Sequence, residues 1–164
     1  MKKYEFTGKT KRVELWNRTA TLHRIKATVE FGFVKVGELG GWIEKEENLS
    51  HEGKAWVCGD AKVCGDAEVC GDAKVWGNAN VCGNAEVFLA SHVLVMGSVG
   101  SRNDFTTFFR DKDNEITVKC GCFLGKIDKF LEKVTQTHGN NKYALVYRAA
   151  VEVAKLQIEL TERK

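Results

Sequence analysis

Residues 53–87 read GKAWVC GDAKVC GDAEVC GDAKVW GNANVC GNAEV, a six-residue unit that repeats almost six times without a slip. Gly opens each unit, Ala takes the third place and Val takes the fifth. Self-similarity at a fixed short period is the sequence signature of a solenoid, in which each repeat stacks on its neighbours. This repeat therefore decides the fold of the middle of the chain.

The spacing within the unit predicts which side chains face inward. Ala and Val lie two residues apart, so on a short strand they point to the same side. The residues between and beside them, Lys or Glu and Cys or Trp, point to the other side. The Gly-Asp or Gly-Asn pair supplies a corner, because these residues tolerate left-handed backbone angles. We therefore expect a prism with Ala and Val inside and one unit along each side.

This pattern resembles the hexapeptide-repeat family, whose fold is a left-handed parallel β-helix. In that family three units close one triangular coil, an aliphatic residue fills the interior, and a small residue lies inside near the corner. Val and Ala match those two places. Residues 22–50, LHRIKATVEFGFVKVGELGGWIEKEENLS, are similar to the leader that precedes such repeats in small proteins of bacteriophages and prophages. The resemblance implies a fold and a phage context, but a fold alone implies no function.

The repeat is expected to continue in degenerate form on both sides. Counting units back from Ala55 assigns Ile43 and Leu49 to the alanine place. Counting forward keeps Val93 and Val99 in the valine place. The count also puts a glycine, at position 41, in the glycine place, so we expect the coil to begin there.

The domain organisation follows from these limits. We expect a N-terminal β cap over residues 1–40, because a bare solenoid end exposes core and strand edges. The left-handed β-helix covers residues 41–101, and a C-terminal region covers residues 102–164. That last region has the pattern of a β-hairpin over residues 102–124, followed by an antiparallel helix pair over residues 124–138 and 142–163. The predicted fold class is therefore mainly β with C-terminal α.

Composition limits the classes of partner. The net charge of +3, with both signs interspersed, is too weak to predict nucleic-acid binding. There is no apolar run long enough to span a membrane and no signal peptide in the first residues, so we expect a protein of the bacterial host's cytoplasm. Four of the six Cys share a repeat place with Trp76, which favours packing by reduced thiols over a disulfide framework.

One outer side of the predicted prism is the most apolar. It carries two Trp residues, Trp56 and Trp76, on its outer surface. Two solvent-facing Trp on one side are typical of an interface, so we expect a homo-oligomer with a trimer favoured. A solenoid of about three coils also has few repeats with which to stabilise itself. Two alternatives stay open: the chain's own hairpin or helices cover this side, or the side is a ligand platform. The interface residues we predict are Trp56, Cys58, Trp76 and Leu94.

No catalytic or metal-binding set emerges from the sequence. Resemblance to hexapeptide acyltransferases would ask for a His base, and His92 is placed for that role, but the long helices of those enzymes are missing. A zinc site of the γ-carbonic-anhydrase type needs three converging His, and no pair here has suitable spacing. Cys120 and Cys122 have no second pair to join them, so packing is favoured. We expect no catalytic residue, no metal and no cofactor.

Three functional hypotheses remain. The first is a non-catalytic, oligomeric phage protein that counters host defence by sequestering a nucleotide signal in pockets between subunits. Its ligand-binding residues would be His92, Arg102, Phe105 and Arg110, with Arg102 pairing phosphate and an aromatic ring stacking on the base. The second is an acyltransferase-like enzyme. The third is a purely structural or host-protein-binding module whose C-terminal helices contact the partner. The alternative for Phe105, Phe108 and Phe109 is a hairpin that buries its phenylalanine face against the helices.

Overall fold

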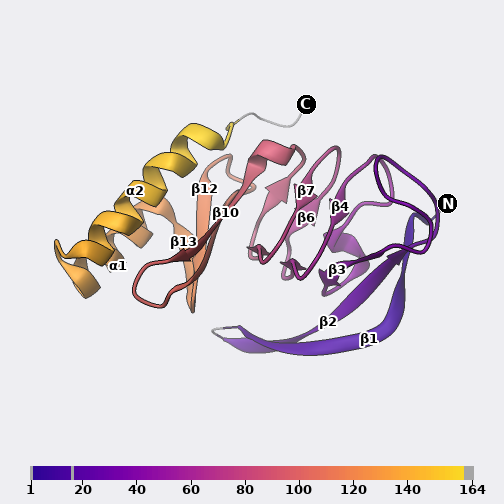
Figure 1. Ribbon diagram of the computed structural model, residues 1–164, viewed down its shortest axis with the longest axis horizontal. Helices are drawn as coiled ribbons and strands as arrows, with labels where there is room; N and C mark the ends of the chain where they lie inside the picture. Colours follow the sequence, from indigo (N-terminus) through magenta and orange to yellow (C-terminus); the bar gives the residue numbers. More distant parts are fainter. Residues whose placement is uncertain (1, 16, 161–164) are drawn as a thin grey trace.

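The computed structural model describes residues 2–15 and 17–160, and over these residues the chain is mainly β with two α-helices at the end (Figure 1). The strands are β1 (Tyr4–Leu15), β2 (Arg18–Ala27), β3 (Leu39–Ile43), β4 (Trp56–Val57), β5 (Lys62–Val63), β6 (Glu68–Val69), β7 (Lys74–Val75), β8 (Asn80–Val81), β9 (Glu86–Val87), β10 (Val93–Val99), β11 (Asp104–Arg110), β12 (Ile116–Cys120) and β13 (Phe123–Lys126). The helical elements are the 3-10 turns η1 (Glu46–Asn48) and η2 (Ala90–His92) and the α-helices α1 (Ile127–His138) and α2 (Lys142–Gln157).

The repeat forms a parallel coil with eighteen residues per turn. Strands β4, β5 and β6 pair in parallel with β7, β8 and β9, and in each pair the partners are eighteen positions apart, as in Val57 with Val75. Each strand is two residues long, so three strands and three corners complete one turn. The backbone N–H of Cys58 donates to the carbonyl of Val75 across 2.9 Å, and equivalent bonds follow along the coil. Three repeat units therefore bring the chain back over itself.

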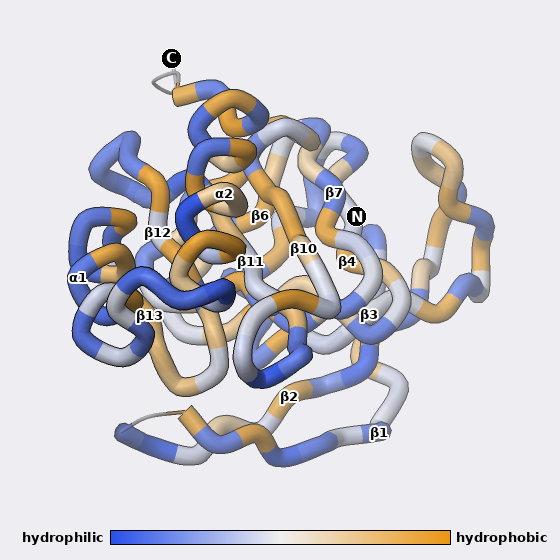
Figure 2. The backbone as a smooth tube through the Cα atoms, turned by 60° about the vertical axis from the view of Figure 1, so that its left-hand side comes forward, coloured by the Kyte–Doolittle hydropathy of each residue, from blue (hydrophilic) through white to orange (hydrophobic). Residues whose placement is uncertain are grey.

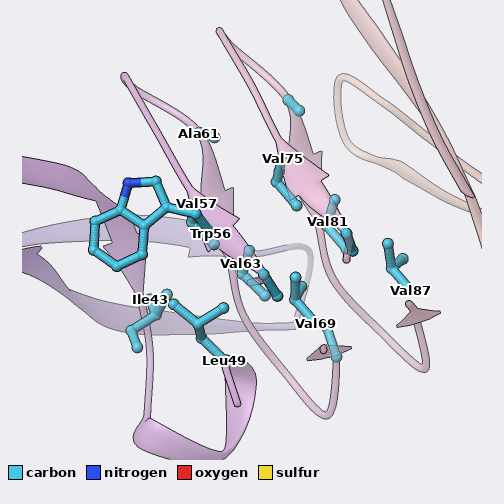
Figure 3. Close-up of a cluster of buried hydrophobic side chains, with 14 of the residues drawn as sticks. Ile43, Leu49, Trp56, Val57, Ala61, Val63, Val69, Val75, Val81 and Val87 are labelled. Carbon is cyan, nitrogen blue, oxygen red and sulfur yellow. The ribbon is translucent and has the colours of Figure 1, made fainter. Parts of the chain in front are cut away.

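The interior of the coil holds the residues that the sequence predicts. Every Ala and Val of the repeat over residues 53–87 is at most 1% exposed. Figure 3 shows the valines standing in a column, with Ile43 and Leu49 continuing it at the N-terminal end. Burial of a valine side chain stabilises a fold by about 1.5–3 kcal/mol, so this column is a large share of the core.

The corners need glycine for two reasons. Gly53 and Gly71 have positive φ values of 70° and 61°, a region that L side chains rarely adopt. A Cβ atom on Gly53 would also lie 2.8 Å from the carbonyl oxygen of Gly71, one coil further on. The close approach of successive coils therefore fixes glycine at these positions, together with the backbone angle.

The start of the coil differs in phase from our expectation. Ile43 pairs in parallel with Val63, and Leu49 forms a bridge with Val69, in each case twenty positions later. Both residues thus occupy the valine place, and the assignment to the alanine place is wrong. Because the step is twenty residues here and eighteen further on, the corner after Leu49 holds two additional residues.

Asn48 joins the first corner to the next coil. Its side-chain oxygen accepts the N–H groups of Glu44 and Lys45 at 3.1 and 2.9 Å. Its side-chain amide donates to the carbonyls of Gly65 and Ala67 at 3.1 and 2.9 Å. The side chain is fully buried, and these four bonds use its whole hydrogen-bonding capacity.

The N-terminal strands close the first end of the coil. β1 and β2 form an antiparallel hairpin, and β2 continues the pairing onto β3, which in turn pairs with β5. Tyr4 is buried and its hydroxyl donates to the carbonyl of Leu49 at 2.7 Å. The rings of Tyr4 and Phe31 contact Trp56 edge-on, with centroids 6.4 and 5.3 Å away. A N-terminal β cap was predicted, and the structure has one.

The same hairpin also covers one side of the coil, which we did not predict. Ala20 and Leu22 of β2 pack with Trp42, Cys64 and Cys82 in a separate buried cluster. Cys64 and Cys82 point outward from stacked strands, and the hairpin lies over them. Figure 2 shows β1 and β2 running along the coil.

An antiparallel sheet follows the coil and closes its second end. β10 pairs antiparallel with β11, with Val93 opposite Phe109, so the expectation that the coil continues to residue 101 is wrong. The glycine corner is missing after β9, where η2 turns the chain instead. Phe109 is fully buried and belongs to the same core as the coil's valines. The backbone N–H of Asn80 donates to the hydroxyl of Thr107 at 2.9 Å, which fixes β11 across the coil's open end.

Helices α1 and α2 pack on the sheet β10-β11-β12-β13. Their shared core includes Phe108, Val118, Phe130, Tyr147 and Val151. Of the three hairpin phenylalanines only Phe108 is buried against the helices, because Phe109 belongs to the coil core and Phe105 is exposed. The residue that follows α1 is a glycine with φ of 61°, a backbone angle that glycine adopts readily. The second helix ends at Gln157, short of the predicted limit, and residues 161–163 of that prediction lie outside the described residues.

We predict that Asn48→Ala lowers the free energy of unfolding by about 3 kcal/mol, because it leaves buried backbone groups of two coils without partners. Chemical denaturation monitored by circular dichroism measures the change. The exposed corner residue Asn78 is a matched control, and Asn78→Ala should cost less than about 0.5 kcal/mol. Equal effects of the two substitutions would show that Asn48 does not join the coils.

Candidate functional site

The predicted ligand-binding residues do not converge on one site. His92 and Arg110 are buried, at 0% and 2% exposure, whereas Arg102 and Phe105 are exposed. Arg102 lines a hollow beside the C-terminal helices, and Phe105 lines a different hollow of about 380 Å³ with Lys62 and Lys119. The four residues therefore do not form one group in a single chain, and the hollow at Phe105, unlike that at Arg102, also includes an acidic residue, Asp104.

His92 and Arg110 belong to the closure of the coil. The Nδ1 atom of His92 accepts the backbone N–H groups of Phe88 and Leu89, each at 3.2 Å. The guanidinium of Arg110 lies 4.9 Å from the ring centre of Phe88 and donates to the carbonyl of Glu86 at 2.9 Å. Burial and the charge of Arg110 lower the pKa of His92 to about 4. A neutral imidazole enclosed in this way has no access to a substrate, so it does not act as an acyltransferase base.

The hollow at Arg102 lies between the β12–β13 turn and the two helices. Its volume is about 330 Å³. Its walls come from the loop after β10, the β12–β13 turn, α1 and α2. The lining residues are Ser101, Arg102, Cys120, Cys122, Phe123, Phe130, Lys133, Val134, Thr137, His138 and Tyr147.

The charged groups of this hollow have one sign. Arg102 and Lys133 line it, and among its described lining residues none is acidic. The guanidinium of Arg102 lies against the backbone of Gly121, where an added Cβ would be 2.8 Å from Nη1. Gly121 has a positive φ of 57°, so the tight β12–β13 turn leaves room for the arginine. The hollow is therefore suited to an anion.

Aromatic rings form its inner wall. Phe123 and Phe130 have centroids 5.4 Å apart, and Phe130 meets Tyr147 edge-on at 5.6 Å. Phe130 and Tyr147 are only 3% and 4% exposed, so packing in the second core fixes their positions. His138 stacks on Tyr147 at 5.9 Å and lies 3.3 Å, Nε2 to Oγ, from Ser101. The cations thus stand beside a rigid apolar surface.

Sequence reasoning missed Lys133, Phe123, Phe130 and Tyr147 as site residues. The helical periodicity places Phe130 and Tyr147 on the apolar faces of the two helices, and both are core residues in the structure. It gave no sign that the edge of that core remains open beside two cations, because this depends on how three separate elements meet. The position of Lys133, directly before the last buried residue of α1, Val134, carries no such signal either.

The predicted interface residues lie in different surroundings. Trp56 is 1% exposed, and Figure 3 shows its indole pointing away from the valine column toward the N-terminal strands. Cys58 packs against the coil core, and Leu94 packs in the second core. Trp76 is 49% exposed and stacks on Phe33, with centroids 5.5 Å apart. The chain itself covers most of this side, so these four residues do not form one exposed surface.

The cysteines are free thiols, as predicted. The hydrogen bond with Cys82 and burial raise the pKa of the Cys64 thiol, and burial raises the pKa of Cys58 to about 11. Both thiols are thus protonated at neutral pH and act as packing groups. Among the described residues, no group of three or more His, Cys, Asp or Glu side chains is placed to hold a metal ion.

Two further findings concern relatives and membranes. No model of a known protein family and no curated protein sequence matches this chain. Within residues 2–15 and 17–160, neither α-helix has the length and apolar composition needed to cross a membrane.

We predict that His92 makes the protein less stable in acid. The unfolded chain binds a proton at His92 below a pH of about 6.5, whereas the folded chain does so only below about 4. Stability is therefore lost as the pH falls from about 6.5 toward 4. In His92→Asn the side-chain oxygen still accepts the two N–H groups but does not titrate.

Thermal unfolding of both proteins between pH 7 and pH 4 tests this. The melting temperature of the parent should fall relative to that of His92→Asn by about 5 °C over this range. The carboxylates are present in both proteins, so their effect on the melting temperature cancels in the comparison. Parallel curves would contradict the buried neutral state of His92.

Proposed function

We propose that this chain is a non-catalytic binding protein that holds a small nucleotide in the hollow lined by Arg102 and Lys133. The observation that supports this best is the combination of two cations with an aromatic wall. Arg102 would form charge-assisted hydrogen bonds to phosphate, with Lys133 as a second positive charge. A base would lie against the half-buried ring of Phe123.

The size of the hollow narrows the ligand. At about 330 Å³ it stands at the low end of the range for small-molecule sites. A mononucleotide, linear or cyclic, fits that volume better than a dinucleotide does. The site in this proposal lies within one chain, in place of the intersubunit pocket expected from the sequence.

The fold and the biological context are part of the proposal. The eighteen-residue parallel coil with Val and Ala inside supports a left-handed β-helix of the hexapeptide-repeat type. The similarity of residues 22–50 to phage leaders supports a phage protein that acts in the cytoplasm of a bacterial host. Sequestering a nucleotide signal would then counter a host defence.

The alternatives have less support. The acyltransferase-like reading needs an accessible base, and His92 is enclosed. A host-protein-binding module would use the C-terminal helices, and the aromatic hollow between them is not needed for that role. The trimer stays an untested prediction, and the outer side on which we expected it is largely covered by the chain itself.

We predict that Arg102→Ala weakens nucleotide binding by about 10- to 100-fold, because it removes a charge-assisted hydrogen bond. Lys133→Ala should weaken binding by a smaller factor, since its contribution is a point charge. Isothermal titration calorimetry with linear and cyclic mononucleotides and cyclic dinucleotides measures both effects.

Lys129 provides the control. It lies one turn before Lys133 on the same helix, is exposed and pairs with Glu132. Lys129→Ala should therefore bind like the parent. If the parent binds none of these compounds, nucleotide binding is wrong. If Arg102→Ala binds as tightly as the parent, the ligand site lies elsewhere.

A further inference from the structure

Helix α2 carries a second apolar stripe in addition to the one that packs on the sheet. Its inner face buries Ala144, Tyr147, Ala150, Val151 and Ala154 in the second core. Its outer face exposes Leu145 at 60%, Val153 at 45% and Leu156 at 88%. In Figure 1 the helix lies at the outer edge of the molecule, with the sheet on its inner side.

The spacing of the outer residues places them on one strip. Leu145, Ala149, Val153 and Leu156 follow each other at intervals of four, four and three residues, which line up along one side of an α-helix. Ala149, in the middle of this strip, is small enough to let a second helix come close. Burial of a leucine side chain is worth about 1.5–3 kcal/mol, so a strip with two exposed leucines favours a partner.

The charges beside the strip indicate which partner fits. Glu152 and Lys155 lie on the same flank of the strip, and their side chains are 70% and 49% exposed. They already form a weak pair along the helix, with 3.5 Å between Nζ and Oε1. Glu152 comes before Lys155 along the chain. When a second α2 runs in the opposite direction, the acidic residue of each helix therefore faces the basic residue of the other.

We infer that two copies of this chain pair through their α2 helices in an antiparallel, two-fold symmetric dimer. Val153 lies close to the two-fold axis. Each Glu152 then faces Lys155 of the partner subunit, and the same pair forms twice. A parallel arrangement would instead place this flank against the other flank of the partner helix, where the Glu152–Lys155 pair does not form, and it would align the two helix dipoles unfavourably.

This inference does not rest on the proposed nucleotide site. The hollow at Arg102 is formed by the inner side of α2, α1 and the β12–β13 turn, whereas the strip lies on the outer side of α2. Nucleotide binding and dimerisation are therefore separate properties, and each is tested without the other.

Sedimentation velocity over roughly 1–200 µM protein tests the dimer, because self-association depends on concentration. We expect the parent to sediment with twice the chain mass of 18.3 kDa. Leu156→Glu should sediment as a monomer and keep the circular dichroism spectrum and melting curve of a folded chain. Val36, exposed at 65% on the N-terminal part, supplies the control, and Val36→Glu should remain a dimer.

Charge reversal tests the antiparallel geometry. Glu152→Lys alone and Lys155→Glu alone should each weaken the dimer by about 10-fold, because each places like charges opposite one another. The double variant Glu152→Lys/Lys155→Glu should restore the parent's dissociation constant. A parent that is monomeric throughout, a Leu156→Glu variant that dimerises like the parent, or a double variant without rescue would each overturn the inference.

Discussion

Backbone hydrogen bonds between successive coils are the interaction on which the rest of this protein depends. The N–H groups of Trp56, Lys62 and Glu68 donate to carbonyls one coil further on, over 2.9–3.1 Å. The same stacking brings alanines and valines into one dry column. A stack of this kind satisfies its own interior but leaves both ends open, with unpaired backbone groups and bare side chains. The remainder of the chain is arranged to close those ends.

The two closures use different means. At the first end Tyr4 and Asn48 bond to the backbone of the coil, and the β1–β2 hairpin extends its sheet. At the second end Phe109 continues the apolar column, and the guanidinium of Arg110 donates a hydrogen bond to the carbonyl of Glu86. His92 and Arg110, which the sequence suggested as ligand-binding residues, are buried in the closure of this end. The outer parts of the C-terminal sheet and helices, where we propose the binding site, are not required to seal the coil.

The sequence predicts the coil because one residue type recurs at each place and each place has one environment. It does not predict what lies over an outward-facing residue. Trp56 and Trp76 both take outward places on the same side of the coil, yet one is buried beneath the N-terminal strands and the other is half exposed. The two additional residues after Leu49 shift the phase without a change in composition that would reveal it. The hollow at Arg102 is formed where a turn, α1 and α2 meet, and no local pattern encodes such a meeting.

The central claim is that the coil and both of its closures form one cooperative unit. Native-state hydrogen exchange at single-residue resolution tests it most directly, through amides that donate between coils. Trp42 reports on the contact between the first two coils and Lys62 on the middle of the stack. Cys70, whose partner is the carbonyl of Val87, reports on the last strand of the coil. The account predicts the same free energy of opening for the three amides, equal to that of global unfolding. Exchange at Trp42 or Cys70 that is orders of magnitude faster than at Lys62 would show that the ends fray, and would contradict it.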